Sequence, residues 1–119
     1  MIAAIARDLN FAKDMTGAYS FICKESSTDA LCKCLNAVEG WNWAVGDSYW
    51  YGDYVVSRPF EGVRIRIVDF PTRVDDEFQY DADVRLRESK TPMEVIDAEF
   101  RKILAQIGAH DVQEIEPFD

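Results

Sequence analysis

The sequence predicts an α+β domain in which two main helices pack on one face of an antiparallel sheet. Two consecutive segments, 63–69 and 78–88, alternate apolar and polar residues, which is typical of neighbouring antiparallel strands with one wet face. Two other segments, 28–39 and 93–107, carry apolar residues at helical spacing. The chain has 119 residues, of which 48% are apolar, so we expect one domain spanning 1–119.

The first part of the chain predicts one strand and one helix. Residues 1–16 are interpreted as a short N-terminal helix or arm that ends at Gly17. Segment 18–24 alternates and is expected to form a strand. The hydroxyl-rich run 26–29 is a helix start, because its side chains can accept hydrogen bonds from free backbone N–H groups. The helix is expected over about 28–39, with Gly40 after its end.

Segment 41–57 is the most aromatic part of the chain and favours strand. Residues 46–48 are interpreted as a turn between two strands, with a bulge in one long strand as the alternative. The next strand, 63–69, turns Val63, Ile65 and Ile67 inward and Arg64 and Arg66 outward. Segment 71–77 is expected to be a polar loop, and strand 78–88 follows it.

The last part of the chain predicts the second helix and a short edge strand. Thr91 and Glu94 have the spacing of a capping box, and Pro92 stands at the first helical position. Gly108 ends this helix, and residues 111–116 are expected to form the edge strand. The resulting order is strand, helix, two or three strands, helix, strand, which favours a ferredoxin-like arrangement or a variant of it.

The charge of the chain is strongly negative. Lys and Arg number 13 and Asp and Glu number 22, which gives a net charge of −9. This charge repels nucleic-acid backbones and anionic lipid surfaces, so we expect no direct nucleic-acid binding and no membrane contact. It favours a basic protein partner such as a nuclease, while solubility alone explains it equally well.

The cysteines, the histidine and the N-terminus indicate a cytoplasmic protein without a metal or cofactor. Cys23, Cys32 and Cys34 form no CxxC pair and fit apolar positions, so they are interpreted as buried free thiols in a reducing compartment. One histidine is too few for an ordinary zinc site. The N-terminal apolar run is too short for a signal peptide, and no segment approaches the roughly 20 apolar residues of a membrane span.

The sequence predicts no catalytic machinery. His110 is interpreted as a surface turn residue, because a catalytic base needs a positioned nucleophile and an orienting partner. Asp81 and Asp83 share the outward face of one strand, where two carboxylates suit a divalent ion or an acid–base pair. Cross-strand pairing with the outward arginines is the favoured explanation. These arginines are Arg64, Arg66, Arg85 and Arg87.

Two acidic segments are the candidate partner-binding sites. In segment 47–54, alternate strand residues point to opposite faces. If Trp50 and Tyr54 face the core, the residues exposed together are Asp47, Tyr49, Tyr51 and Asp53. The alternative is that residues 1–16 cover these tyrosines as a second small core. The other candidates, in the predicted loop, are Asp75, Asp76 and Glu77, and exposed tyrosine beside carboxylate suits contact with a basic protein.

In size, acidity, lack of catalytic residues and its aromatic-acidic strand, the whole chain resembles bacterial toxin-immunity proteins, including those of contact-dependent inhibition systems. The resemblance implies a non-enzymatic inhibitor that neutralises a cognate toxin, often a nuclease, inside the producing cell. It assigns no site residue. A phage-encoded acidic inhibitor of a defence nuclease, of anti-CRISPR or anti-restriction type, is the first alternative. A ferredoxin-like domain with a small-molecule pocket or an enzymatic activity is the second.

Overall fold

The computed structural model describes residues 14–48 and 52–118. Nearly all of the predicted N-terminal helix or arm therefore lies outside the described residues. In chain order the elements are β1 Met15–Cys23, α2 Thr28–Ala37, β2 Ala44–Ser48, β3 Gly52–Ser57, β4 Val63–Val74, β5 Glu77–Leu86, α3 Met93–Gln106 and β6 His110–Glu114.

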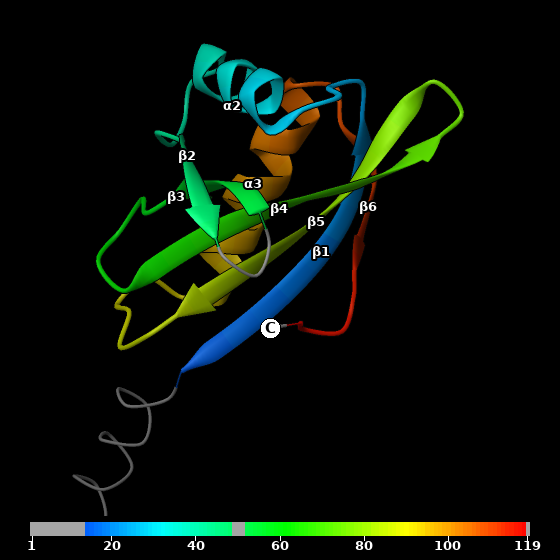
Figure 1. The fold of residues 1–119 in the computed structure, drawn as a ribbon. Coiled ribbons are helices and arrows are strands. Elements are labelled where there is room, and N and C mark those ends of the chain that lie inside the picture. The colour runs from blue at the N-terminus through cyan, green and yellow to red at the C-terminus, as the bar shows by residue number, and fades with distance from the viewer. Residues whose placement is uncertain (1–13, 49–51, 119) are drawn as a thin grey trace, which may run out of the picture.

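The strands form one six-stranded sheet in the order β2-β3-β4-β5-β1-β6, with antiparallel neighbours (Figure 1). The run β4-β5-β1-β6, with α2 after β1 and α3 after β5, has the ferredoxin-like order. The β2–β3 hairpin is inserted between α2 and β4 and widens the sheet at one edge. The predicted α+β class and the ferredoxin-like variant are therefore confirmed.

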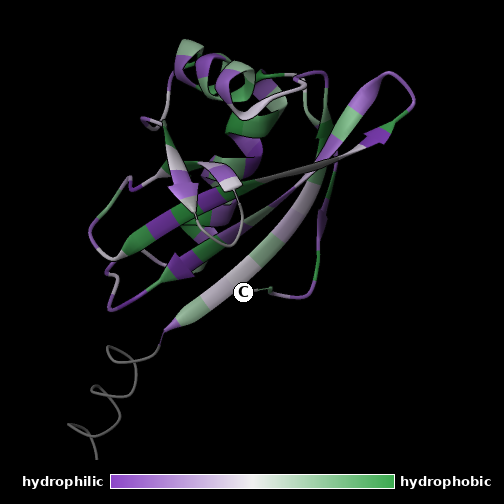
Figure 2. Ribbon diagram, in the orientation of Figure 1, coloured by the Kyte–Doolittle hydropathy of each residue, from purple (hydrophilic) through white to green (hydrophobic). Residues whose placement is uncertain are grey.

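Both helices cover the same face of the sheet, and the core lies between them and the strands (Figure 1). Along β4 and β5 apolar and polar residues alternate, so one side of these two strands supplies much of the core (Figure 2). The largest side chains with no or almost no exposed surface are Phe21, Leu31, Leu35, Ile65, Ile67, Tyr80, Ile96, Phe100, Ile103 and Leu104. This set contains part of the apolar positions that the sequence periodicity assigned to strands β4 and β5 and to both helices. Others, such as Val38, Phe78, Met93 and Ile107, are only partly buried at the edge of the core.

The first helix begins as expected and ends two residues early. The Ser27 hydroxyl accepts a hydrogen bond from the Ala30 N–H at 3.1 Å. The helix ends at Ala37, before Gly40, because the chain turns into an extended conformation at Val38. The Asn36 side chain then binds both the N–H and the C=O of Trp43, which directs the chain from α2 into β2.

Three expectations about the first strands were wrong. Gly17 lies within β1 instead of ending a segment, and residues 46–48 belong to β2 instead of forming a turn. Gly46 is explained by packing, since a Cβ atom there would lie 2.6 Å from Cζ of the Tyr54 ring. The third wrong expectation is that Tyr54 faces the core. Tyr54 stands on the face opposite the helices, because its neighbour Val55 faces the core.

Later boundaries also differ from the prediction. Most of the expected loop 71–77 is strand, since β4 and β5 stay paired up to Val74 and Glu77. The capping box does not form, because the N-cap of α3 is Pro92 and has no side-chain hydrogen bond. The Ser89 hydroxyl instead donates a hydrogen bond to the Thr91 carbonyl and accepts one from the Thr91 N–H. His110 is the first residue of β6 and not a turn residue.

The face opposite the helices was expected to be wet, and at its centre it is not. Asp83 is fully buried and Arg66 is 9% exposed. Nη2 of Arg66 donates a hydrogen bond of 2.7 Å to Oδ2 of Asp83, so cross-strand charge pairing is confirmed for these two residues. Burial also raises the pKa of Asp81, which lies one row further along the same face.

Candidate interaction surfaces

The turn between β4 and β5 is an exposed acidic tip. Val74 pairs with Glu77, so only Asp75 and Asp76 form the turn, and Asp75 adopts a left-handed φ of 56°. The last pairing of β3 with β4 is at Val68, well before the tip. The hairpin therefore projects beyond the edge of the sheet formed with β3 (Figure 1). Asp75 and Asp76 are both exposed, as predicted.

Glu77, the third residue predicted in this cluster, is engaged within the protein. Its Oε1 lies 2.9 Å from Nε2 of His110, and Oδ2 of Asp111 lies 2.8 Å from Nδ1 of the same ring. These hydrogen bonds to the carboxylates of Glu77 and Asp111 raise the pKa of His110. Glu77 therefore connects the tip end of β5 to β6, and it is half-buried rather than presented to a partner.

Asp47 and Asp53 lie directly opposite each other on β2 and β3, and both are exposed. Like charges in this position repel each other and weaken the strand pairing. Because β2 and β4 are both antiparallel to β3, the β2–β3 and β4–β5 connections lie at the same end of the sheet. The two connections point the same way, but Asp53 is next to Tyr54, which pairs with Val68 near the middle of β4, so the Asp47–Asp53 pair lies well short of the hairpin tip. Tyr49 and Tyr51 lie outside the described residues.

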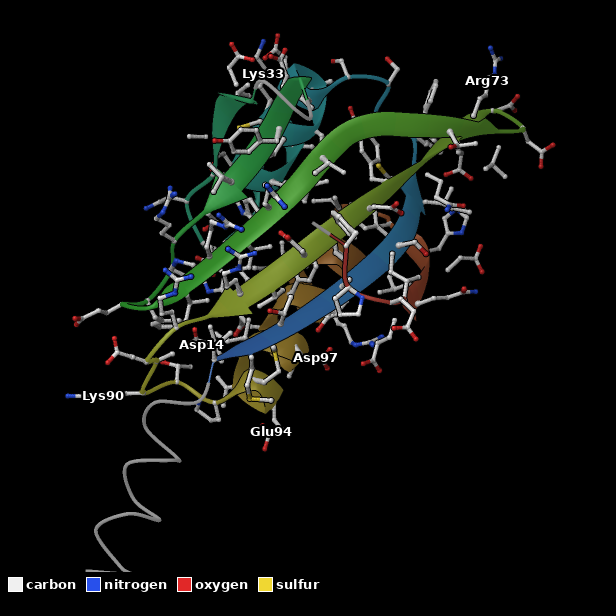
Figure 3. The ribbon with its side chains drawn as sticks, turned by 60° about the horizontal axis from the view of Figure 1, so that its bottom comes forward. Asp14, Lys33, Arg73, Lys90, Glu94 and Asp97 are labelled. Atoms are coloured by element: carbon white, nitrogen blue, oxygen red, sulfur yellow. The ribbon has the colours of Figure 1, made fainter. Side chains whose placement is uncertain are left out.

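The opposite end of β4 and β5 carries a basic hollow that the sequence analysis did not identify. It encloses about 490 Å³ and is lined by four arginines and one glutamate among its charged residues. We call it the arginine hollow. Its lining residues are Arg58, Pro59, Phe60, Glu61, Gly62, Val63, Arg64, Arg85 and Arg87. Figure 3 shows side-chain nitrogens gathered at this end, far from the labelled Arg73 near the hairpin tip.

The arginine hollow is shaped by the loop that precedes β4. Gly62 has a φ of 80°, and its carbonyl accepts a hydrogen bond of 2.8 Å from the Arg87 N–H. A Cβ atom at Gly62 would lie 2.4 Å from the backbone oxygen of Arg87, so the close approach of the two segments needs glycine. Phe60 packs edge-on against Trp41, with ring centroids 6.5 Å apart, and remains 43% exposed.

The positive charges in the arginine hollow are only partly compensated. Arg64 and Arg85 are direct cross-strand partners, and Nη2 of Arg64 is 4.0 Å from the Asp83 carboxylate that already binds Arg66. Burial lowers the pKa of Arg64, and the nearby arginines, including Arg85 and Arg58, lower it further against the opposing effect of Asp83. The described part of the chain offers Arg58 and Arg85 no ion pair.

The thiols are free and poorly placed for nucleophilic chemistry. Cys23 and Cys32 are buried and Cys34 is half-buried. Burial raises the pKa of all three thiols, that of Cys23 to about 11, so little thiolate exists at neutral pH. Across residues 14–48 and 52–118, histidine, cysteine and carboxylate side chains form no cluster of three that is placed to hold a metal ion. The same residues contain no helix of the length and apolarity needed to cross a bilayer.

No protein-family model matches the chain, and no curated protein matches it in sequence. The features that bear on its function are the acidic tip and the arginine hollow, at the two ends of the β4–β5 hairpin.

Proposed function

We propose that this chain is a non-enzymatic inhibitor of the immunity type, which acts in the cytoplasm by binding a basic toxin, in particular a nuclease. The supporting observation is the projecting hairpin tip with Asp75 and Asp76 exposed on it. A narrow acidic projection is suited to the positively charged groove in which a nuclease holds its substrate. Occupying that groove blocks the substrate without any chemistry by the inhibitor.

The second aspartate pair is a separate acidic contact point, on the β2–β3 hairpin and well short of the tip. Asp47 and Asp53 face each other across β2 and β3, where their repulsion costs stability in the unbound protein. A lysine or arginine of the partner placed between them removes that repulsion and adds charge-assisted hydrogen bonds. The pair therefore favours a basic surface over a neutral one.

The distribution of charge along the hairpin supports oriented association. β4 contains 12 residues, and at about 3.3 Å per residue its two ends are roughly 36 Å apart. Asp75 and Asp76 are exposed beside Arg73 at one end, and four arginines with one glutamate line the other. In the field of a cationic partner this dipole turns the acidic tip toward the partner and raises the association rate.

The experiment is affinity capture followed by kinetics. The immobilised wild-type chain is exposed to a lysate of the source cells, and the captured protein is identified, purified and assayed for nuclease or other toxic activity. The Asp75→Lys/Asp76→Lys variant tests the tip. Its matched control is Glu39→Lys/Glu116→Lys, which makes the same charge change at exposed positions away from the tip.

We expect the wild type and the control to bind and inhibit a basic protein alike. The tip variant should associate at least about tenfold more slowly at low salt, with a smaller difference at high salt, because screening weakens steering. The proposal is wrong if the captured protein keeps its activity in the complex. It is also wrong if the tip variant associates at the wild-type rate at every salt concentration.

A phage-encoded inhibitor of a bacterial defence nuclease would need the same acidic surface. The position of the gene distinguishes the two: a toxin gene immediately upstream supports the immunity protein, and neighbouring phage structural genes support the phage inhibitor. The activity of the captured partner gives the same discrimination, since a defence nuclease protects its own cell and a toxin harms it.

The third hypothesis, a small-molecule pocket between the sheet and the helices, loses support. Phe21, Tyr80 and Phe100 fill that space without exposed surface. The arginine hollow lies elsewhere, at the end of β4 and β5. Metabolite binding, if it occurs, is therefore expected at the arginine hollow.

A further inference from the structure

The arginine hollow makes no contact with the partner in the proposed inhibitor, because it lies at the opposite end of the β4–β5 hairpin from the acidic tip. Arg64 and Arg85 repel each other across the strands, and Arg58 adds a third charge beside them. Asp83 compensates Arg64 and Asp14 compensates Arg87 only in part, so the positive charges that gather in this depression weaken the fold. An anion bound there removes this cost.

We propose that the arginine hollow binds a small phosphate-bearing molecule of the nucleotide class. Arginine is suited to this ligand because its planar guanidinium donates two parallel hydrogen bonds to a pair of phosphate oxygens. Four arginines converge from two directions. Arg64, Arg85 and Arg87 come from the paired strand ends, and Arg58 comes from the loop before β4.

The size of the hollow favours a small molecule over a macromolecule. Its volume of about 490 Å³ lies within the range of roughly 300–1,000 Å³ typical of small-ligand sites. A longer nucleic acid would pass over the rest of a surface that carries excess negative charge, and that charge repels it. A phosphate-bearing metabolite brings its charge only to the arginines.

Phe60 supports a ligand with a flat apolar part. Its ring lies at the hollow, is 43% exposed, and is held edge-on by Trp41. Trp41 in turn stacks on Phe100 of α3 at a centroid distance of 6.5 Å and an interplanar angle of 11°, which ties the site to the core. An exposed ring held in this way offers a stacking surface for a base.

The first measurement uses the full-length protein with two probes, inorganic pyrophosphate and ADP, at constant ionic strength adjusted with sodium chloride. Calorimetry should show one saturable site for each probe, and the melting temperature should rise with probe concentration as expected for a ligand of the native state. ADP should bind more tightly than pyrophosphate if its base stacks on Phe60. Absence of binding for both probes at millimolar concentration overturns the proposal.

The second measurement uses variants with a matched control. Arg85→Gln removes one half of the repelling pair, so it should leave the ligand-free melting temperature unchanged or raise it while weakening both probes about tenfold or more. Arg73→Gln makes the same change near the hairpin tip and should leave binding intact. Phe60→Ala should weaken ADP more than pyrophosphate. Equal loss of affinity in Arg85→Gln and Arg73→Gln would mean non-specific attraction and contradicts the site.

A third measurement does not depend on any variant folding. Backbone amide signals of the wild-type protein, titrated with ADP, should shift at residues 58–64 and 85–87 and stay unchanged at the hairpin tip. Shifts confined to other regions refute the site. A glutamate-rich peptide that binds the same residues more tightly than ADP would assign the hollow to an acidic protein segment instead. Each of these outcomes leaves the inhibitor proposal untouched, because that proposal concerns the other end of the molecule.

Discussion

Arg66 and Asp83 face each other across β4 and β5, and their side chains meet at 2.7 Å with the carboxylate fully buried. A shift of one residue in the β4–β5 register would separate the two charges and leave each buried without the other. The pair therefore fixes the register that places Arg64 opposite Arg85. The register shifts between Val68 and Thr72, so the pairing that closes the tip at Asp75 and Asp76 is set separately.

Removing Asp83 should be strongly destabilising. We expect Asp83→Ala to lower the free energy of unfolding by about 3–5 kcal/mol, because it leaves the buried Arg66 guanidinium without the carboxylate of Asp83. The control is Asp81→Ala, on the same strand and the same face but only partly buried. It should cost less than about 1 kcal/mol in the same urea titration. Equal costs for the two variants would show that the ion pair does not hold the strands.

The fold could be predicted from periodicity, and the burial of the second sheet face could not. Alternation in 63–69 and 78–88 correctly separated Ile65 and Val84 from Arg66 and Asp83. Alternation assigns residues to one of two faces, however, and says nothing about whether the second face is covered. Asp83 was therefore expected to be wet. Glycine in the sequence predicts a turn at residue 46. The Tyr54 ring, which leaves no room for a Cβ atom there, becomes its neighbour only through the pairing of β2 with β3.

The same limit applies to the binding surfaces. The exposure of Asp75 and Asp76 was predicted correctly, since a polar turn between two strands is a local feature. Glu77 was assigned to a partner although its contact, His110, lies 33 residues along the chain and reaches it only through the sheet order. Alternation placed Arg64 and Arg85 on one outward face, where both were expected to pair with carboxylates. Only the register shows that they stand opposite each other, so the arginine hollow was not predicted. The exposure of Tyr49 and Tyr51 stays a prediction.

His110 should stabilise the fold only when it is protonated. Its pKa is raised above 6.5 by the hydrogen bonds to Glu77 and Asp111. A folded-state pKa above the unfolded value means that the stabilisation is complete below pH 6.5 and is lost as the pH rises through the folded-state pKa. We expect His110→Gln to be less stable than the wild type at pH 5, with a difference that shrinks with rising pH.

The measurement for His110 is direct, since it is the only histidine of the chain. Its single ring signal in NMR should titrate above pH 6.5, and Glu77→Gln should move the midpoint down. Lys24→Gln serves as a control variant at another exposed position on the surface. A pKa at or below 6.5 in the wild type, or no response to Glu77→Gln, contradicts the contact.

Tyr19 should contribute through its hydroxyl as well as its ring. The buried hydroxyl donates a hydrogen bond of 2.7 Å to Oδ1 of Asp97, and the Arg101 guanidinium lies over the ring. Burial, followed by the hydrogen bond to Asp97, raises the pKa of Tyr19 far above 10. We expect Tyr19→Phe to cost about 1.5–3 kcal/mol, because the lost bond has a charged acceptor. Tyr54→Phe, at a half-buried ring on the other face, should cost less than about 0.5 kcal/mol in the same denaturation experiment.

Gly62 should be the glycine that tolerates alanine least, and the chain contains a matched control for it. Gly62 and Gly108 have nearly equal φ values of 80° and 83°, so alanine pays a similar conformational cost of about 1 kcal/mol at either position. Only at Gly62 does the added Cβ meet backbone, 2.4 Å from the Arg87 oxygen, whereas nothing lies within 4 Å at Gly108.

The difference between the two glycine variants therefore isolates the close approach that shapes the arginine hollow. Gly62→Ala should be at least about 1–2 kcal/mol less stable than Gly108→Ala in urea, in line with other overpacked sites. It should also weaken pyrophosphate binding, because the loop that carries Arg58 must move away from Arg87. If both variants lose the same stability and keep the same affinity, the contact between Gly62 and Arg87 does not shape the site.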